Sequence, residues 1–125
     1  MTAERGPELL VSANYTFESE DRARELGVTG GLVSPRSGRG HRMLDLANMI
    51  RVPGEDRRVR QRELDRVLEI IVQAARDQSI TLPTAGAYLS LRISFSDDGE
   101  QLGFALASEF LGAWSNLGGD LMIDN

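Results

Sequence analysis

A chain of 125 residues, of which 41% are hydrophobic, is long enough to form one domain with a core of its own. The absence of cysteine excludes disulfides, thiolate metal sites and cysteine nucleophiles. The net charge is −5, all 14 basic residues are arginine, and no apolar run approaches the roughly 20 residues that a membrane helix requires. Because no basic and apolar leader opens the chain, we expect a cytoplasmic protein that forms a single domain over residues 1–125.

The first strand is predicted over residues 9–17, where apolar and polar side chains alternate with the period of a half-buried strand. Ser19 is predicted to cap a short helix that ends at Gly27, in the manner of a glycine C-cap. We expect residues 1–7 to be a flexible terminus. The glycine- and arginine-rich residues 30–41 are predicted to form a mobile loop.

Residues 42–52 fit two structures. Leu44, Leu46 and Ile50 fit a strand. One face of a helix fits equally well, with Met43, Leu46, Ala47 and Ile50 on it. We favour a strand that ends in a proline-glycine turn.

The rest of the chain predicts helix, strand, helix and strand. Residues 57–78 carry an apolar stripe at helical spacing and predict the one long helix. Residues 88–95 alternate as a strand does. Ser108 is predicted to cap a helix that buries Trp114, and a glycine pair leads from there to a last strand over residues 120–124.

These elements predict the α+β class, with a four-stranded mixed or antiparallel sheet and three helices packed on one face. A ferredoxin-like sandwich or a variant of it is the nearest common architecture. A doubly wound sheet is disfavoured because its parallel strands would be continuously apolar, and these strands alternate. An exposed edge strand, either the first or the last, could support dimerisation or strand addition.

The C-terminal pattern resembles a bacterial family of domains of unknown function. The similar residues are Leu89-Ser-Leu-Arg-Ile-Ser-Phe95, Gly103-Phe-Ala-Leu-Ala-Ser-Glu-Phe-Leu111 and Leu117-Gly-Gly-Asp-Leu-Met-Ile-Asp124. The middle of the chain departs from that family, because it lacks a counterpart of the tryptophan-containing strand usual there. The resemblance implies a small partner-binding domain, whose relatives are suspected to act as immunity proteins beside secreted toxins. It carries over no catalytic residue.

An acidic turn is the first candidate binding surface. Asp97, Asp98 and Glu100 surround a glycine, without the alternating aspartates and distal glutamate of a calcium loop. We interpret the cluster as a turn that could dock a basic partner. Asp120 and Asp124 would extend this patch if the last strand lies nearby.

A basic middle segment is the alternative surface. Its arginines could contact phosphates, but no aromatic residue lies between Phe17 and Tyr88 to stack on bases. Many of these arginines are explained equally well as exposed residues at the beginning of the long helix, where they pair with interspersed acidic residues. The arginines concerned are Arg36, Arg39, Arg42, Arg57, Arg58, Arg60 and Arg62.

The sequence contains no catalytic, metal or cofactor motif of real specificity. His41 is the only histidine, and Asp45 is its sole local acidic partner, which is too few ligands for a zinc site. The glycine-rich segments lack the lysine of a phosphate-binding loop. We therefore expect no metal, no cofactor and no enzymatic activity.

The function predicted from the sequence is protein binding. The preferred version is a cytoplasmic immunity or inhibitor protein whose acidic patch occludes the active site of a partner toxin. One alternative is a nucleic-acid-associated protein that uses the arginine-rich segment 36–62. Another is a structural subunit of a larger bacterial assembly.

Overall fold

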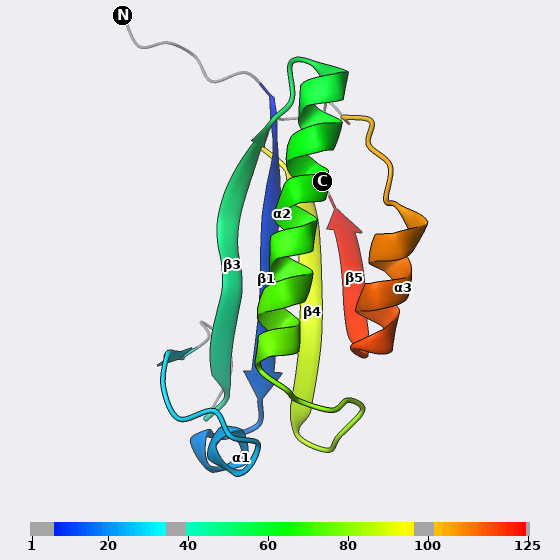
Figure 1. Cartoon of the computed structure of the whole chain (residues 1–125). Coiled ribbons are helices and arrows are strands. Elements are labelled where there is room, and N and C mark those ends of the chain that lie inside the picture. Colours follow the sequence, from blue (N-terminus) through cyan, green and yellow to red (C-terminus); the bar gives the residue numbers. More distant parts are fainter. Residues whose placement is uncertain (1–6, 35–39, 97–101, 125) are drawn as a thin grey trace, which may run out of the picture.

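The structure is a computed structural model, and it describes residues 7–34, 40–96 and 102–124. Three helices and five strands are arranged around one sheet in this part of the chain (Figure 1). In chain order they are β1 (Glu8–Phe17), α1 (Glu20–Glu25), β2 (Leu32–Val33), β3 (Arg42–Pro53), α2 (Arg57–Asp77), β4 (Ala87–Phe95), α3 (Ser108–Asn116) and β5 (Gly119–Asp124).

The sheet is mixed, with the strand order β2-β3-β1-β4-β5. β1 is antiparallel to both of its neighbours, and β4 and β5 are parallel. The α+β class predicted from the sequence is confirmed. The predicted number of four strands was wrong, because the sheet has five. The fifth strand, β2, lies within the predicted loop 30–41. The sequence did not indicate this strand, because a strand of two residues is too short to show an alternation.

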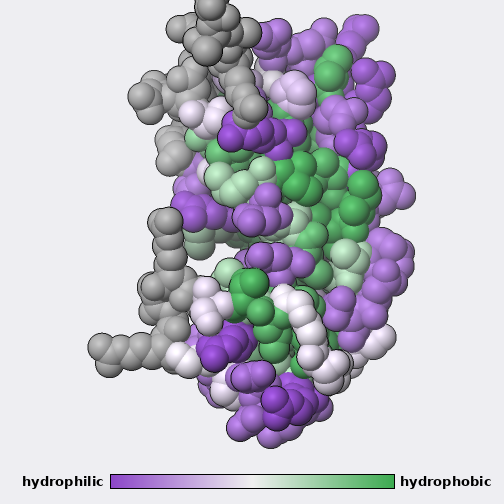
Figure 2. All heavy atoms as spheres, turned by 90° about the vertical axis from the view of Figure 1, so that its left-hand side faces the viewer, coloured by the Kyte–Doolittle hydropathy of each residue, from purple (hydrophilic) through white to green (hydrophobic). Residues whose placement is uncertain are grey.

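The core lies between the sheet and α2. The inward side chains of β1 (Leu9, Val11, Ala13, Tyr15 and Phe17) are 0% exposed. The helix α2 runs along this face of the sheet, nearly parallel to the strands (Figure 1). Seen from the β3 edge, apolar side chains fill the space between sheet and helix, and hydrophilic side chains surround them (Figure 2). Trp114 of α3 is 2% exposed, so its predicted place in the core is confirmed.

The helix boundaries follow local capping chemistry, with one exception. Ser19 caps α1, and Asp56 caps α2 by accepting the backbone N–H groups of Arg58 and Val59. α3 differs from the prediction, because Ser108 is its first residue and Ala107 is the N-cap, without a side-chain hydrogen bond.

Only two helices cover the sheet face. α1 has six residues and is therefore only about 9 Å long, and it lies beyond the end of β1 (Figure 1). α2 and α3 lie side by side over the sheet. The prediction that three helices pack on one face is therefore corrected to two helices, α2 and α3.

The ambiguous segment 42–52 is a strand, as predicted. Two register shifts relative to β1 each place an extra residue in β3, so Leu44, Ala47 and Ile50 face the core opposite Tyr15, Ala13 and Val11. Inward residues three positions apart imitate a helix face. The bulges thus explain why the sequence fitted both structures.

The Tyr15 hydroxyl provides a test of the packing between β1 and α2. It donates a hydrogen bond of 3.2 Å to the Ala75 carbonyl, and burial raises the pKa of Tyr15 above its ordinary value of 10.0. Because the unfolded tyrosine ionises first, we expect stability to fall as the pH rises above about 10. Tyr15→Phe should remove this dependence and lower the free energy of unfolding at neutral pH by about 1 kcal/mol. The loss stays small because the Gln78 backbone N–H also donates to that carbonyl.

Urea unfolding at pH 7 and above pH 10 measures both effects. Tyr88→Phe is the matched control, since Tyr88 is the other tyrosine of the chain and is 56% exposed. Equal alkaline destabilisation of the wild type and Tyr15→Phe would contradict the assignment.

Candidate functional site

The two faces of the sheet differ sharply. One is covered by α2 and α3, and no element of the described residues covers the other (Figure 1). We call the uncovered side the open face. Because directly opposed residues share a face, the strand registers assign its members. They are Glu8, Leu10, Ser12, Asn14 and Thr16 of β1, Val33 of β2, Met43, Asp45, Asn48, Met49, Arg51 and Pro53 of β3, Tyr88, Ser90, Arg92 and Ser94 of β4, and Asp120, Met122 and Asp124 of β5.

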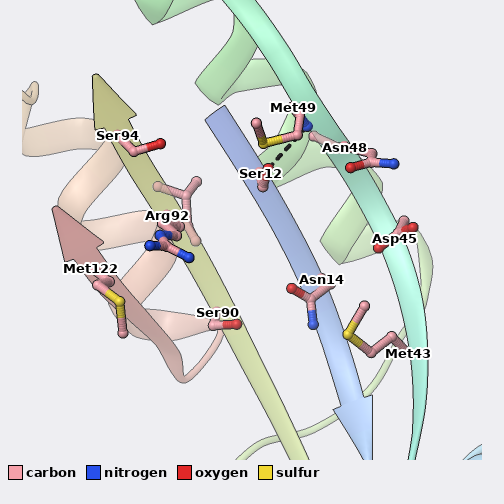
Figure 3. A pocket seen from close by; sticks show the side chains of 12 residues that line it. Ser12, Asn14, Met43, Asp45, Asn48, Met49, Ser90, Arg92, Ser94 and Met122 are labelled. Carbon is pink, nitrogen blue, oxygen red and sulfur yellow. Dashed lines mark hydrogen bonds between the residues drawn. The ribbon is translucent and has the colours of Figure 1, made fainter. Parts of the chain in front are cut away.

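The open face is hollowed over its central strands. The hollow has a volume of about 530 Å³, and Figure 3 shows its lining. Small polar side chains from β1 and β4, such as Ser12 and Ser90, form its floor. Met43 and Met49 rise from β3, and Met122 rises from β5 on the opposite side. The serines on the central strands β1 and β4 leave space between the methionines of the outer strands β3 and β5.

The hollow concentrates methionine. The chain has four methionines, and each of the three that follow Met1 lines this site. Met49 is 53% exposed and Met122 is 58% exposed. Methionine is flexible and polarisable, so it adapts to the shape of a partner, and it is over-used at protein-binding surfaces.

Met49 holds a backbone conformation that is uncommon for a side chain of its size, with a φ of 52°. The position lies in one of the bulges of β3. Its N–H donates a hydrogen bond of 2.9 Å to the Ser12 hydroxyl on the floor of the hollow (Figure 3). Strained residues of this kind persist where the surrounding structure holds them, and they concentrate at functional sites.

The charge of the open face is mainly acidic. Arg92 pairs with Asp124 at 2.5 Å, and the hydrogen bond and charge of that carboxylate raise the pKa of Arg92. The pair contributes little to stability because the Arg92 side chain is 59% exposed. Asp45 and Asp120 are exposed, and neither takes part in an ion pair among the described residues.

The structure describes two of the five predicted acidic residues. Asp120 and Asp124 lie together on the open face of β5, opposite Ser90 and Ser94. The other three members of the predicted patch lie outside the described residues. They are Asp97, Asp98 and Glu100.

The predicted basic residues are not brought together on one surface. Arg36 and Arg39 lie outside the described residues. Arg42 begins β3, whereas Arg57, Arg58 and Arg62 follow its far end, and 12 residues of strand span about 40 Å. Arg60 is buried, and its guanidinium donates hydrogen bonds to the carbonyls of Gly54 and Gly103. It holds loops together instead of facing solvent.

Three further features of the described residues bear on function. They contain no group of three His, Cys, Asp or Glu side chains that could hold a metal ion. No helix among them is long and apolar enough to cross a membrane. A second hollow, of about 430 Å³, lies between α2 and α3, and its polar lining carries both signs of charge, including Asp65, Glu69 and Arg76.

Comparison of the chain with protein-family models, with curated proteins and with solved structures gives no match. The open face is therefore interpreted from its own geometry.

Sequence reasoning missed the floor and the methionines of the hollow. The alternation of β1 and β4 did show that Ser12, Asn14 and Ser90 point away from the core. That alternation could not show that these positions lie side by side, because β1 and β4 are joined through two other strands and the long helix.

Proposed function

We propose that this chain is a non-enzymatic protein-binding domain and that the open face receives its partner. One observation carries the proposal. Helices cover one face of the sheet, while the other face carries a hollow with polar side chains at its floor and methionines at its rim. A concave surface with adaptable apolar walls and a few polar groups is typical of a binding site.

The acidic balance of the open face favours a basic partner. The described acidic residues there include Asp45, Asp120 and Asp124, and Arg92 is already paired with the last of these. Complementary charge speeds association and discriminates against acidic partners. In the preferred version, the protein is a cytoplasmic immunity or inhibitor protein that occludes the basic active site of a toxin, as the family resemblance of residues 88–125 implies. Its association rate should then fall as the salt concentration rises.

The nucleic-acid alternative has weaker support, since its arginines are spread over both ends of β3 and Arg60 is buried. A structural subunit would use the same open face, so it differs from an inhibitor in the identity of the partner.

We also propose that the domain is a variant of the ferredoxin-like sandwich. The order β1-α1-β2-β3-α2-β4 matches the β-α-β-β-α-β plan of that fold. The chain departs from this plan in its short α1 and β2 and in the added α3 and β5.

Ser90→Tyr tests the open-face proposal. The tyrosine would fill the floor of the hollow from the solvent side, so we expect the protein to fold and its affinity for the native partner to fall at least about tenfold. Tagged wild type and variant are used to capture partners from the native host at low salt, with nuclease treatment. The affinity for the recovered partner is then measured.

Ser115→Tyr is the matched control, because Ser115 is an exposed serine on α3. Retention of the partner by Ser115→Tyr and its loss by Ser90→Tyr would support the open face. Equal retention by both variants would contradict it, and recovery of nucleic acid alone would favour the arginine-rich segment.

A further inference from the structure

In the part of the chain that the structure describes, the sheet has two free edges, and they are not equivalent. β2 pairs with only two residues at the start of β3, and the remainder of that edge is interrupted by the two bulges. β5 forms the other edge, and its register with β4 runs without a shift over all six of its residues. Bulges protect an edge against further pairing, whereas a regular edge presents backbone groups to another strand. In β5 the Asp120 carbonyl already accepts a hydrogen bond from Trp114 Nε1.

The side chains of β5 make this edge amphipathic. Leu121 is 36% exposed and Ile123 is 48% exposed on the helix side of the sheet. Leu111 of α3, the helix that packs against β5, is 43% exposed and adds a third apolar group on that side. On the open-face side, the same strand presents Asp120, Met122 and Asp124.

Charge argues against a second copy of the chain as the occupant. An antiparallel pairing of two β5 strands about a two-fold axis through Met122 keeps both open faces on one side. It also sets Asp120 of each copy opposite Asp124 of the other. Like charges directly opposite each other destabilise a strand pair. Asp124 is already paired with Arg92, whereas Asp120 takes part in no ion pair among the described residues and would favour a basic side chain opposite it.

We propose that the β5 edge accepts an extended segment of a basic partner protein as an additional strand. Apolar side chains of that segment pack on Leu121 and Ile123, and its arginine or lysine side chains face Asp120. Backbone hydrogen bonds supply the affinity, and the alternation of β5 supplies the specificity. This edge is a second surface beside the hollow, and its occupation does not require the open face to be filled.

Binding of a short synthetic peptide that alternates arginine and valine tests the proposal. Titration into isotope-labelled protein, followed by nuclear magnetic resonance, should shift the amide signals of Leu121, Met122 and Ile123. Hydrogen exchange should slow at those of the three residues whose N–H groups point away from β4. A matched peptide with glutamate in place of arginine should not bind. Asp120→Asn should weaken binding roughly two- to five-fold, whereas Asp21→Asn on α1, which lies beyond the end of β1 (Figure 1), should leave it unchanged.

N-methylated peptides separate strand addition from adsorption on a face. A β-strand directs alternate N–H groups to opposite sides, so methylation in one alternating frame should abolish binding and methylation in the other should preserve it. Equal binding of both methylated peptides, shifts confined to Ser12, Met49 and Ser90, or no binding of the arginine peptide would each overturn the proposal. None of these outcomes would contradict the open-face proposal, which Ser90→Tyr tests with the native partner.

Discussion

Replacing Arg60 with methionine is expected to lower the free energy of unfolding by about 3 kcal/mol. Arg60 is 6% exposed, and its Nε donates to the Gly103 carbonyl at 2.8 Å while its Nη1 donates to the Gly54 carbonyl. Methionine fills a similar volume and excludes water, so both carbonyls would lose their donor. Arg60→Ala should lose less, about 2 kcal/mol, because water can enter the space and hydrate them.

The effect of Arg60 should extend to β5. The segment 102–107 leads into α3, and it is held to α2 by Arg60 at Gly103 and by Gln61, whose side-chain amide exchanges two hydrogen bonds with the Ala105 backbone. Hydrogen exchange in β5 should therefore be faster in Arg60→Met, beyond what global destabilisation explains.

Urea unfolding measures the change, and Arg62→Ala is the control. Arg62 is exposed, so its replacement should change stability by less than about 0.5 kcal/mol. If Arg60→Met changed the free energy of unfolding as little as Arg62→Ala does, Arg60 would not have the structural role described above.

Gly119→Ala is expected to lower the free energy of unfolding by about 3 kcal/mol. A Cβ atom at this position would approach Trp114 Cε2 and Nε1 to 2.4 Å, so the ring would have to move. That ring is 2% exposed, and its Nε1 donates a hydrogen bond of 3.0 Å to the Asp120 carbonyl. The expected loss combines about 1–3 kcal/mol for overpacking with about 1 kcal/mol for the hydrogen bond.

Trp114 is the only tryptophan, so its fluorescence reports both the unfolding midpoint and the displacement of the ring. Gly112→Ala is the matched control within α3. Nothing lies within 4 Å of a Cβ at Gly112, and alanine favours a helix, so this variant should gain about 0.5–1 kcal/mol. Similar effects of the two substitutions would show that the Gly119 backbone can move away from the ring.

These two residues hold the elements that carry the proposed surfaces. Arg60 holds the segment 102–107 that leads into α3, and Gly119 allows Trp114 to pack against the first residue of β5. β5 in turn supplies Met122 to the hollow and its outer edge to the proposed strand addition. We expect variants at either position to weaken partner binding through the placement of β5, without a direct contact to the partner.

The sequence by itself determined the elements whose signals are local. The alternation over residues 9–17 and 88–95, the stripe of α2 and the glycine end of α1 are properties of neighbouring residues. Periodicity and capping act over a few positions, so they can be recognised in one chain. The same local character made β3 ambiguous, because its bulges depend on pairing with β1.

Only the tertiary structure decided the features that join distant parts of the chain. It placed β1 in the centre of the sheet, so the first strand is not an edge and β5 is. It also buried Arg60, separated Arg42 from Arg57 and gathered Met43, Met49 and Met122 around one hollow. Strand order and register depend on which faces pack together across long sequence separations, and an alternating strand shows that it has an apolar face without showing which strands lie beside it.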